Sequence, residues 1–138
     1  MRYWLIKSEP FKWSWNDQAK AGKKGAAWDG VRNHLAKQHL MAMKKGDTCF
    51  FYHSNEGKEI VGICTVIKPH YPDPTAKDGE PWVVVDVMAD KSLPKPVTLA
   101  QVKADKKLAK MALVTSARLS VQPVTAEEWK HICKLGGL

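Results

Sequence analysis

The sequence predicts an α+β fold in which a mixed or antiparallel β pseudo-barrel is surrounded by helices. Two neighbouring stretches, Thr48 to His53 and Ile60 to Ile67, carry apolar residues on both faces, which is typical of strands covered on both sides. The segment between them, Asn55-Glu56-Gly57-Lys58, is a hairpin turn signal. Helix start signals lie near both ends of the chain, so we expect helices outside the barrel.

The N-terminal third predicts a strand and two helices. Tyr3 to Ile6 is a short, bulky run that favours a buried strand, and we expect it to close the barrel. Ser14 and Asp17 form a capping box that begins a short helix ending near Gly22. A second helix is predicted from His34 to Met43 because its apolar residues recur at helical spacing.

The stretch after the hairpin predicts a long loop and a third strand. Residues 69–81 carry several prolines, which stiffen a loop, and loops of this length in small domains are often functional. Trp82 to Ala89 is almost wholly apolar and predicts a strand that ends before Leu93-Pro94-Lys95-Pro96.

The C-terminal part predicts short helices, a strand and a final helix. One or two short helices are expected between Thr98 and Lys110, and a last strand from Leu119 to Val124. Thr125 and Glu128 form a capping box for a helix that ends at Gly136.

Length and charge limit the function classes. At 138 residues the chain is expected to be one domain, residues 1–138. The net charge of +8 favours a polyanionic partner, nucleic acid first, although a basic surface that serves only solubility is the alternative. Three widely spaced cysteines form no zinc motif and no apolar run is long enough for a membrane span. We expect a monomer without metal or cofactor, located in the cytoplasm, or in the nucleus of a eukaryotic cell.

The segment Trp28-Asp29-Gly30-Val31-Arg32-Asn33 concentrates groups that recognise ligands. An aromatic face can stack on a flat ring, and Asp29 and Asn33 can read donors and acceptors on the edge of that ring. Arg32 can pair with a phosphate or fix carboxylates of its own loop. The alternative is a structural loop, in which Trp28 fills the core and Asp29 caps a helix.

Catalytic motifs are largely absent. Cys49 and His53 share a predicted strand face but lie about 13 Å apart along it, beyond hydrogen-bond reach. No nucleophile elbow, P-loop or metal-binding spacing occurs. An enzyme or sensor acting on a nucleobase-like small molecule, with Glu9 or Asp29 as general base, is therefore kept as the alternative to a binding module.

Five motifs in order resemble the EVE domain family: residues 3–10 (YWLIKSEP), residues 28–33 (WDGVRN), Gly46-Asp47 with Phe50 to Ser54, Tyr71-Pro72-Asp73, and residues 116–121 (SARLSV). The resemblance covers essentially the whole chain. It implies a PUA-like pseudo-barrel related to the ASCH domains and to the YTH readers of methylated adenine. It also implies a non-catalytic module that reads a modified base in DNA or RNA through an aromatic-lined pocket.

The likeness to YTH domains implies roles for individual residues. Lys7-Ser8 matches the strand end that leads to the pocket, Trp28 the first cage aromatic, and Tyr71 the second. The expected base-binding residues are Lys7, Ser8, Glu9, Trp28, Asp29, Asn33, Tyr52, His53, Ser54, Tyr71, Pro72 and Asp73. Glu9 departs from the asparagine often found there, and because a carboxylate accepts hydrogen bonds it favours the exocyclic amine of cytosine or adenine.

Two further expectations concern geometry. Phosphate contacts are assigned to exposed basic positions, Lys23, Lys24, Arg32 and Lys58. Six pocket residues are expected to meet at one cavity: Ser8, Glu9, Trp28, Asn33, Ser54 and Tyr71.

Overall fold

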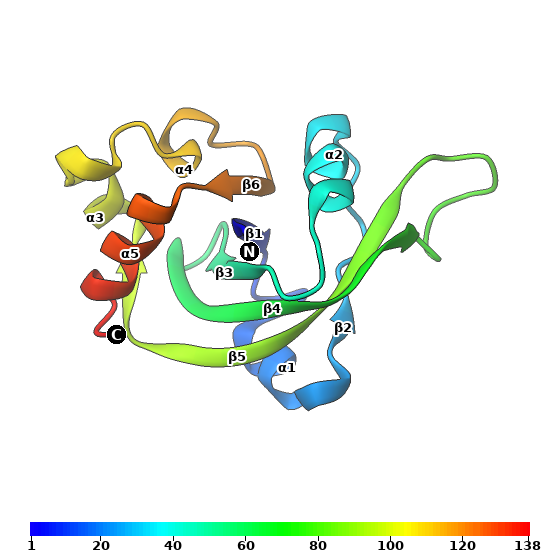
Figure 1. Ribbon diagram of the computed structural model, residues 1–138, viewed down its shortest axis with the longest axis horizontal. Helices are drawn as coiled ribbons and strands as arrows, with labels where there is room; N and C mark the ends of the chain where they lie inside the picture. Colours follow the sequence, from blue (N-terminus) through cyan, green and yellow to red (C-terminus); the bar gives the residue numbers. More distant parts are fainter.

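The computed structural model describes residues 1–138 and contains one six-stranded mixed sheet in the order β2-β5-β4-β3-β1-β6 (Figure 1). The strands are β1 (Tyr3–Ser8), β2 (Ala26–Ala27), β3 (Thr48–His53), β4 (Glu59–Pro72), β5 (Val83–Thr98) and β6 (Val121–Val124). The α-helices are α1 (Trp15–Lys20), α2 (His34–Ala42), α3 (Leu99–Ala104), α4 (Ala112–Thr115) and α5 (Ala126–Leu135), and the 3₁₀ helices are η1 (Gly22–Lys24) and η2 (Lys106–Leu108). The predicted class, a curved mixed sheet with helices outside, is confirmed.

β1 lies inside the sheet and does not close it, so that expectation is wrong. It pairs in parallel with β3 and antiparallel with β6, and the edge strands are β2 and β6. The position of β1 in the sheet depends on its pairing with β3 and β6, which the apolar pattern of one strand does not specify. The helix α2 packs against β6, β5 and β4, and so lies across the gap between the two ends of the curved sheet.

The hairpin of β4 and β5 is much longer than predicted. Tyr71 and Pro72 still pair with Val84 and Val83, so the connecting loop is shorter than the proline pattern indicates. β5 also continues through Pro94 and Pro96. Both prolines lie in the irregular stretch between the pairs Gly62–Ser92 and Ile60–Val97, where the register shifts. Residues in such a bulge do not donate backbone hydrogen bonds to the partner strand, so the missing N–H of proline is tolerated there.

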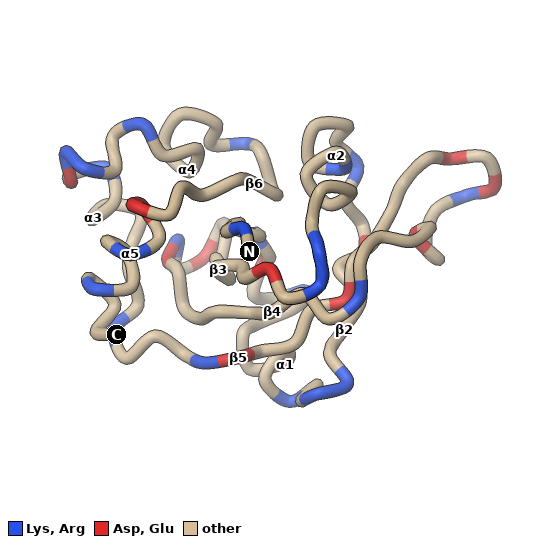
Figure 2. Tube along the Cα trace, viewed as in Figure 1, with Lys and Arg blue, Asp and Glu red and all other residues tan.

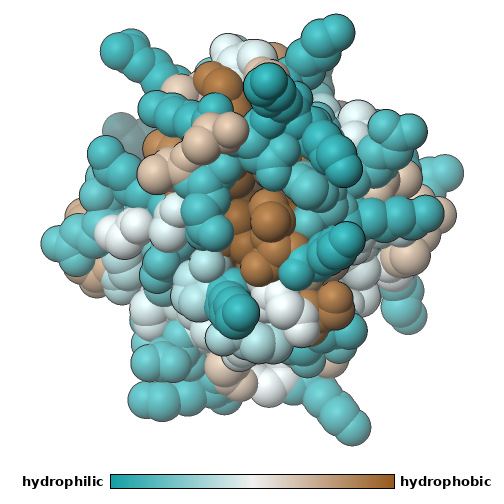
Figure 3. Space-filling view, turned by 90° about the vertical axis from the view of Figure 1, so that its left-hand side faces the viewer, coloured by the Kyte–Doolittle hydropathy of each residue, from teal (hydrophilic) through white to brown (hydrophobic).

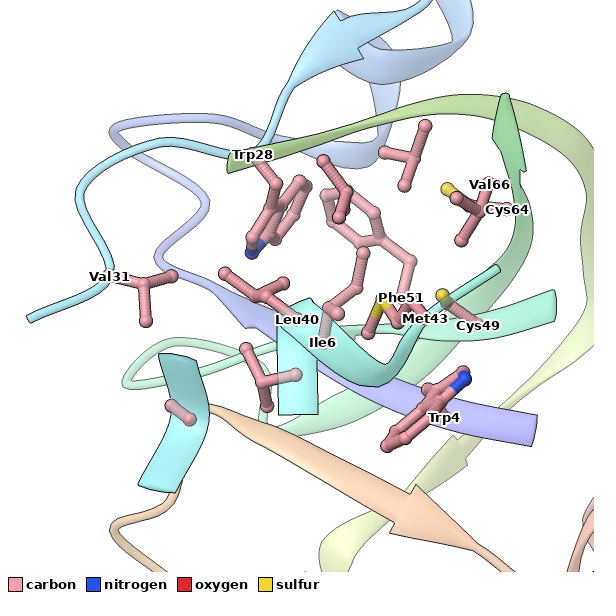
Figure 4. Packing of buried hydrophobic residues seen from close by; sticks show 14 of the residues in the cluster. Trp4, Ile6, Trp28, Val31, Leu40, Met43, Cys49, Phe51, Cys64 and Val66 are labelled. Carbon is pink, nitrogen blue, oxygen red and sulfur yellow. The ribbon is translucent and has the colours of Figure 1, made fainter. Parts of the chain in front are cut away.

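The sheet has an apolar core on each face, which explains why its strands are apolar on both sides. Trp4 and Ile6 of β1 enter the core shown in Figure 4, together with Phe51 of β3 and Leu40 of α2. Leu5, between them in sequence, enters the opposite core, which α3, α4 and α5 cover. The same alternation determines which of the two cores each polar side chain at a strand end lies next to.

Helix starts follow the sequence closely. The predicted capping boxes at Ser14 and Thr125 both form, and Thr98 makes a third with Gln101. The start of α2 is capped by Asn33, whose side-chain oxygen accepts from the backbone N–H of Ala36 at 2.9 Å.

Candidate nucleic-acid interface

Polar side chains collect where the parallel strands β1 and β3 end. Ser8 pairs with His53, and the N–H of Ser54 donates to the carbonyl of Ser8 at 2.9 Å. Asn55 Nδ2 donates to Glu9 Oε2 at 2.7 Å, which joins the hairpin turn to the end of β1. We call this group, Ser8, Glu9, His53, Ser54 and Asn55, the strand-end rim.

An aromatic cluster lies directly beside the rim. Phe51, two residues before His53 on the same strand face, meets three rings edge-on: Trp15 at 5.2 Å, Trp28 at 5.4 Å and His53 at 5.7 Å between centroids. Edge-to-face contacts of this kind are favourable and fix ring orientation. The rim therefore borders an aromatic cluster in which Phe51 is fully buried and Trp15 is half-buried, and polar groups beside aromatic rings are what a base-binding site needs.

The segment between β1 and α1 crosses this end of the sheet. Ser8 Oγ donates to the carbonyl of Trp13 at 2.6 Å, and the N–H of Trp15 donates to His53 Nε2 at 3.0 Å. The Trp15 ring lies against Gly62, where any Cβ would collide with it, and its indole N–H donates to Ser92 Oγ at 2.8 Å. Through these contacts Trp13 and Trp15, both half-buried, border the rim. Neither residue was part of the predicted site.

Trp28 is nearly enclosed, with 7% of its surface exposed. Its backbone N–H donates to the carbonyl of Val85 at 2.8 Å, and its ring packs among Phe51 and the other apolar side chains of Figure 4. Asp29 next to it is exposed and caps no helix, because Asn33 does so. The alternative in which Trp28 fills the core describes the structure.

Arg32 pairs with a carboxylate of the protein itself. Asp73 Oδ2 accepts from Arg32 Nη1 at 3.0 Å and from the N–H of Gly30 at 3.0 Å, while Arg32 Nη2 donates to Thr75 Oγ1 at 3.0 Å. Burial opposes ionisation of Asp73, but the hydrogen bonds from Thr75, Arg32 and Gly30 outweigh it and lower the pKa of Asp73 to about 2. We call Gly30, Arg32, Asp73 and Thr75 the carboxylate latch.

Tyr71 lies in a different hollow from the rim residues. A groove of about 530 Å³ between α2 and the β4–β5 hairpin is lined by Lys37, Met41, His70, Tyr71, Pro72, Glu80, Pro81, Trp82 and Val83. The Tyr71 hydroxyl donates to Asp86 Oδ1 at 2.5 Å, and this bond together with burial raises the pKa of Tyr71 to about 12. The predicted pairing of Tyr71 with Trp28 around one base is therefore not seen in this arrangement.

Asn33 also lies apart from the rim. It lines a second groove of about 400 Å³ with Leu35 and the loop Ser116, Ala117, Arg118 and Leu119. Its side-chain oxygen already accepts the hydrogen bond of the helix cap, whereas its amide nitrogen has no partner within the protein. Arg118 is exposed in the same loop; it belongs to a motif quoted for the family resemblance, which is the signal that could have added it to the site.

Lys7 and Tyr52 point to the opposite face of the sheet. Tyr52 is 3% exposed in the core under α3 to α5, where burial raises its pKa. Lys7 Nζ donates to the carbonyl of Ala117 at 2.6 Å, and burial lowers its pKa. Strand alternation separates these two side chains from Ser8 and His53, although all four are adjacent in sequence or register.

The remaining predicted phosphate contacts lie on the surface. Lys23 and Lys24 are exposed in η1, and Lys58 is exposed in the hairpin turn next to the rim. Burial lowers the pKa of His53, against the opposing charge of Glu59, so the ring is neutral at pH 7 and Nε2 can accept from Trp15. No group of three or more His, Cys, Asp or Glu side chains is placed to hold a metal ion. None of the helices has the length and apolarity that crossing a bilayer requires.

A curved mixed sheet that stays open between its edge strands β2 and β6, with helices packed outside, is the arrangement of a PUA-like pseudo-barrel. The chain belongs to the EVE domain family, whose sequence model matches residues 2–135. It is 35% identical to human thymocyte nuclear protein 1 over 164 aligned positions that cover 96% of this chain and 73% of the relative.

Solved structures agree with this assignment. A protein from Agrobacterium tumefaciens is 54% identical with a TM-score of 0.98 over 100% of this chain and 94% of that one. Human THYN1 in complex with DNA containing 5-methylcytosine is 34% identical, with a TM-score of 0.91 over 100% of this chain and 99% of that one. A YTH domain from Zygosaccharomyces rouxii, solved with N6-methyladenosine RNA, shares the fold at 17% identity and a TM-score of 0.61, covering 99% of this chain and 87% of that one.

Proposed function

We propose that this chain is a non-catalytic module that binds nucleic acid through a modified base, and that its ligand is a modified cytosine in DNA. The observation that carries the proposal is the strand-end rim beside the aromatic cluster around Phe51. The solved DNA complex of a family member with 5-methylcytosine supports the choice of cytosine and of DNA.

The rim supplies the groups that would read the edge of the base. Ser54 carries a hydroxyl that can donate and accept. The hydroxyl of Ser8 can accept, since its proton is donated to Trp13, and Glu9 carries a carboxylate that only accepts. The Glu9 side chain is 31% exposed, so its oxygens can reach a ligand although one contacts Asn55 and the other lies 3.5 Å from Lys12 Nζ. A carboxylate acceptor fits the exocyclic amine of cytosine, which 5-methylation leaves in place.

The aromatic cluster would hold the plane of the base. Trp13 and Trp15 are the more accessible rings, and Trp28 forms the enclosed wall behind Phe51. A base that reaches this surface must leave the duplex stack, which costs a few kcal/mol, and stacking on an aromatic side chain returns about 1–3 kcal/mol. Exposed basic side chains near the rim would contact the backbone and make the affinity depend on salt.

The enzyme alternative has less support in the site. A general base works best when burial raises its pKa towards neutrality. Asp29 is exposed, and Glu9 is partly exposed beside Lys12, so neither carboxylate is enclosed. Incubating the protein with free nucleosides and with modified oligonucleotides, followed by mass spectrometry, tests this alternative directly; any turnover would contradict a purely binding role.

The test of the proposed function is a binding series with matched oligonucleotides. One DNA sequence is compared as duplex and single strand, each with cytosine or 5-methylcytosine at one position, alongside RNA with adenine or N6-methyladenine. We expect tightest binding to 5-methylcytosine DNA and a loss of affinity as salt rises. Equal affinity for all of these ligands, or preference for the RNA, would overturn the proposal.

A further inference from the structure

A single segment between β5 and β6, residues 99–120, connects two sides of the strand-end rim. At its start the N–H of Leu99 donates to the carbonyl of Lys58 at 2.8 Å, in the turn that follows Asn55. At its end the N–H of Lys7 donates to the carbonyl of Ser120 at 3.0 Å, and Lys7 Nζ donates to Ala117 at 2.6 Å. Both ends of this segment are therefore fixed next to the strand-end rim, at Lys58 and Lys7, while its middle packs over the core on the face of the sheet opposite the aromatic cluster.

The segment is strongly basic and its cations are exposed. It contains five lysines or arginines and a single acid, so it carries about half of the net charge of +8. All five basic residues lie on the surface: Lys103, Lys106, Lys107, Lys110 and Arg118. We call these five residues and the backbone that carries them the basic segment.

The one acid forms no salt bridge with these lysines. Asp105 Oδ2 lies 2.5 Å from His131 Nε2, and Asp105 Oδ1 accepts from the N–H of Lys107 at 2.9 Å. These contacts lower the pKa of Asp105, the His131 bond most. The carboxylate is therefore occupied by the protein, and the lysines around it have no salt-bridge partner in the structure.

The backbone that carries these cations is held in place. Val102, Leu108 and Met111 are buried in the core beneath and anchor the segment between its lysines. Gln122 Nε2 contacts the carbonyls of Ser116 at 3.0 Å and Leu119 at 2.8 Å, which holds the loop carrying Arg118. The basic residues alternate with these buried apolar residues and therefore lie on the solvent-exposed side of the segment.

The figures place the basic segment along one edge of the molecule. Figure 2 shows its lysines and arginine in blue from the outer end of α3, past α4, to the start of β6. Figure 3 views the side that carries α3 and α5, where hydrophilic side chains project around a small apolar patch. The acidic residues of the β4–β5 loop lie at the far side of the molecule in Figure 2. This separation would orient a polyanion towards the basic edge.

We propose that the basic segment is the surface that holds the nucleic-acid backbone on either side of the base being read, in preference to the lysines of α1 and η1. The inference rests on the proposed function, because it places the backbone next to the strand-end rim. Contacts to phosphate position a nucleic acid without reading its sequence, so the basic segment sets affinity and the rim sets base preference.

The experiment compares two matched triple variants. Lys106→Gln/Lys107→Gln/Lys110→Gln removes three exposed cations from the basic segment, and Lys20→Gln/Lys23→Gln/Lys24→Gln removes three from α1 and η1. Each protein is titrated with the same 5-methylcytosine duplex and its unmethylated control over a series of salt concentrations. Vesicles containing phosphatidylserine serve as a different polyanion.

We expect the basic-segment variant to flatten the plot of log affinity against log salt by about 0.9 for each lysine that contacts a phosphate, with methyl preference unchanged. The α1–η1 variant should keep the parental slope. If the α1–η1 variant loses the slope and the basic-segment variant keeps it, the inference is wrong while the proposed function stands. Tighter binding of the parent to vesicles than to DNA, lost in the basic-segment variant, would also overturn it. A parent that binds no nucleic acid at any salt concentration would instead contradict the proposed function itself.

Discussion

The carboxylate latch and the strand-end rim both contain polar and charged residues that sequence motifs single out, but they differ in burial and in hydrogen-bond partners. In the latch, Asp73 is 4% exposed and its two oxygens accept from Gly30, Arg32 and Thr75. In the rim, the Glu9 side chain is 31% exposed and its contacts are to exposed partners. The latch satisfies its charges internally, whereas the rim keeps acceptors that a ligand can reach.

This difference shows that the type of residue does not establish its role. Arg32 has the chemistry to bind phosphate, but its guanidinium joins the loop after Trp28 to the loop after β4. The Asp73 side chain is fully buried, whereas that of Arg32 is 37% exposed. Removing a partner of a buried carboxylate is costly, because the remaining buried charge is then less well compensated. The latch is therefore expected to affect stability first, and the rim to affect binding first.

The largest effect is expected from Trp28, which lies between the two regions. Trp28→Ala should lower the free energy of unfolding by about 3–5 kcal/mol, because it removes a ring that is 7% exposed and leaves a cavity. Chemical denaturation measures this, with Trp28→Phe as the control that keeps most of the packing. A Trp28→Ala protein with parental stability and weakened base binding would make Trp28 part of the rim's function.

The latch should give the next largest effect and a distinct pH dependence. The pKa of Asp73 is about 2 in the folded protein against its ordinary value of 3.8. Since the folded pKa is the lower one, the stabilisation is complete above about pH 4 and is lost as pH falls towards 2. Asp73→Asn should cost about 2 kcal/mol at neutral pH and remove this part of the acid dependence.

Denaturation midpoints of the parent and of Asp73→Asn between pH 2 and pH 7 test this expectation. Asp78→Asn is the matched control, since Asp78 is exposed in the same loop. Equal effects of the two substitutions would show that the latch contributes nothing specific.

The rim predicts the reverse pattern. Glu9→Gln should weaken binding of 5-methylcytosine DNA about tenfold, because it replaces a charged acceptor that faces the amine by a neutral amide. The free energy of unfolding should change little, since the Glu9 side chain is partly exposed. Calorimetric titration measures the affinity, and Glu56→Gln in the adjacent exposed turn controls for net charge. Equal losses in both variants would assign the effect to long-range charge.

The smallest expected effect concerns His53, which belongs to the rim but is partly buried. Burial lowers its pKa from the ordinary value of 6.5, so its neutral form is the stable one in the folded protein. Its contribution to stability is therefore complete above about pH 6.5 and decreases as pH falls through the folded pKa. His53→Gln should lose this component of the pH dependence below about pH 6.5 in denaturation experiments. An unchanged profile would show that His53 does not titrate in this range.

The sequence alone determined the elements whose signals are local. The capping boxes at Ser14 and Thr125 and the hairpin turn at Asn55 to Lys58 form as predicted, because their hydrogen bonds join residues a few positions apart. The motifs at Lys7 to Glu9 and His53 to Ser54 also predicted that two strand ends would meet, and they do. The family resemblance, resting on motifs that span the chain, is confirmed by the match over residues 2–135.

The tertiary structure alone decided which side chains far apart in the sequence contact one another. Which partner Arg32 takes depends on Asp73, 41 positions away, and the loop closure that joins them leaves no local signal. Tyr52 and His53 are separated because they lie on opposite faces of β3, each next to a different core. Because β3 is apolar on both faces, its sequence does not indicate which face lies under α3 to α5. The bulge that lets β5 pass through Pro94 and Pro96 likewise depends on the partner strand, because a proline's missing donor matters only where the partner offers an acceptor.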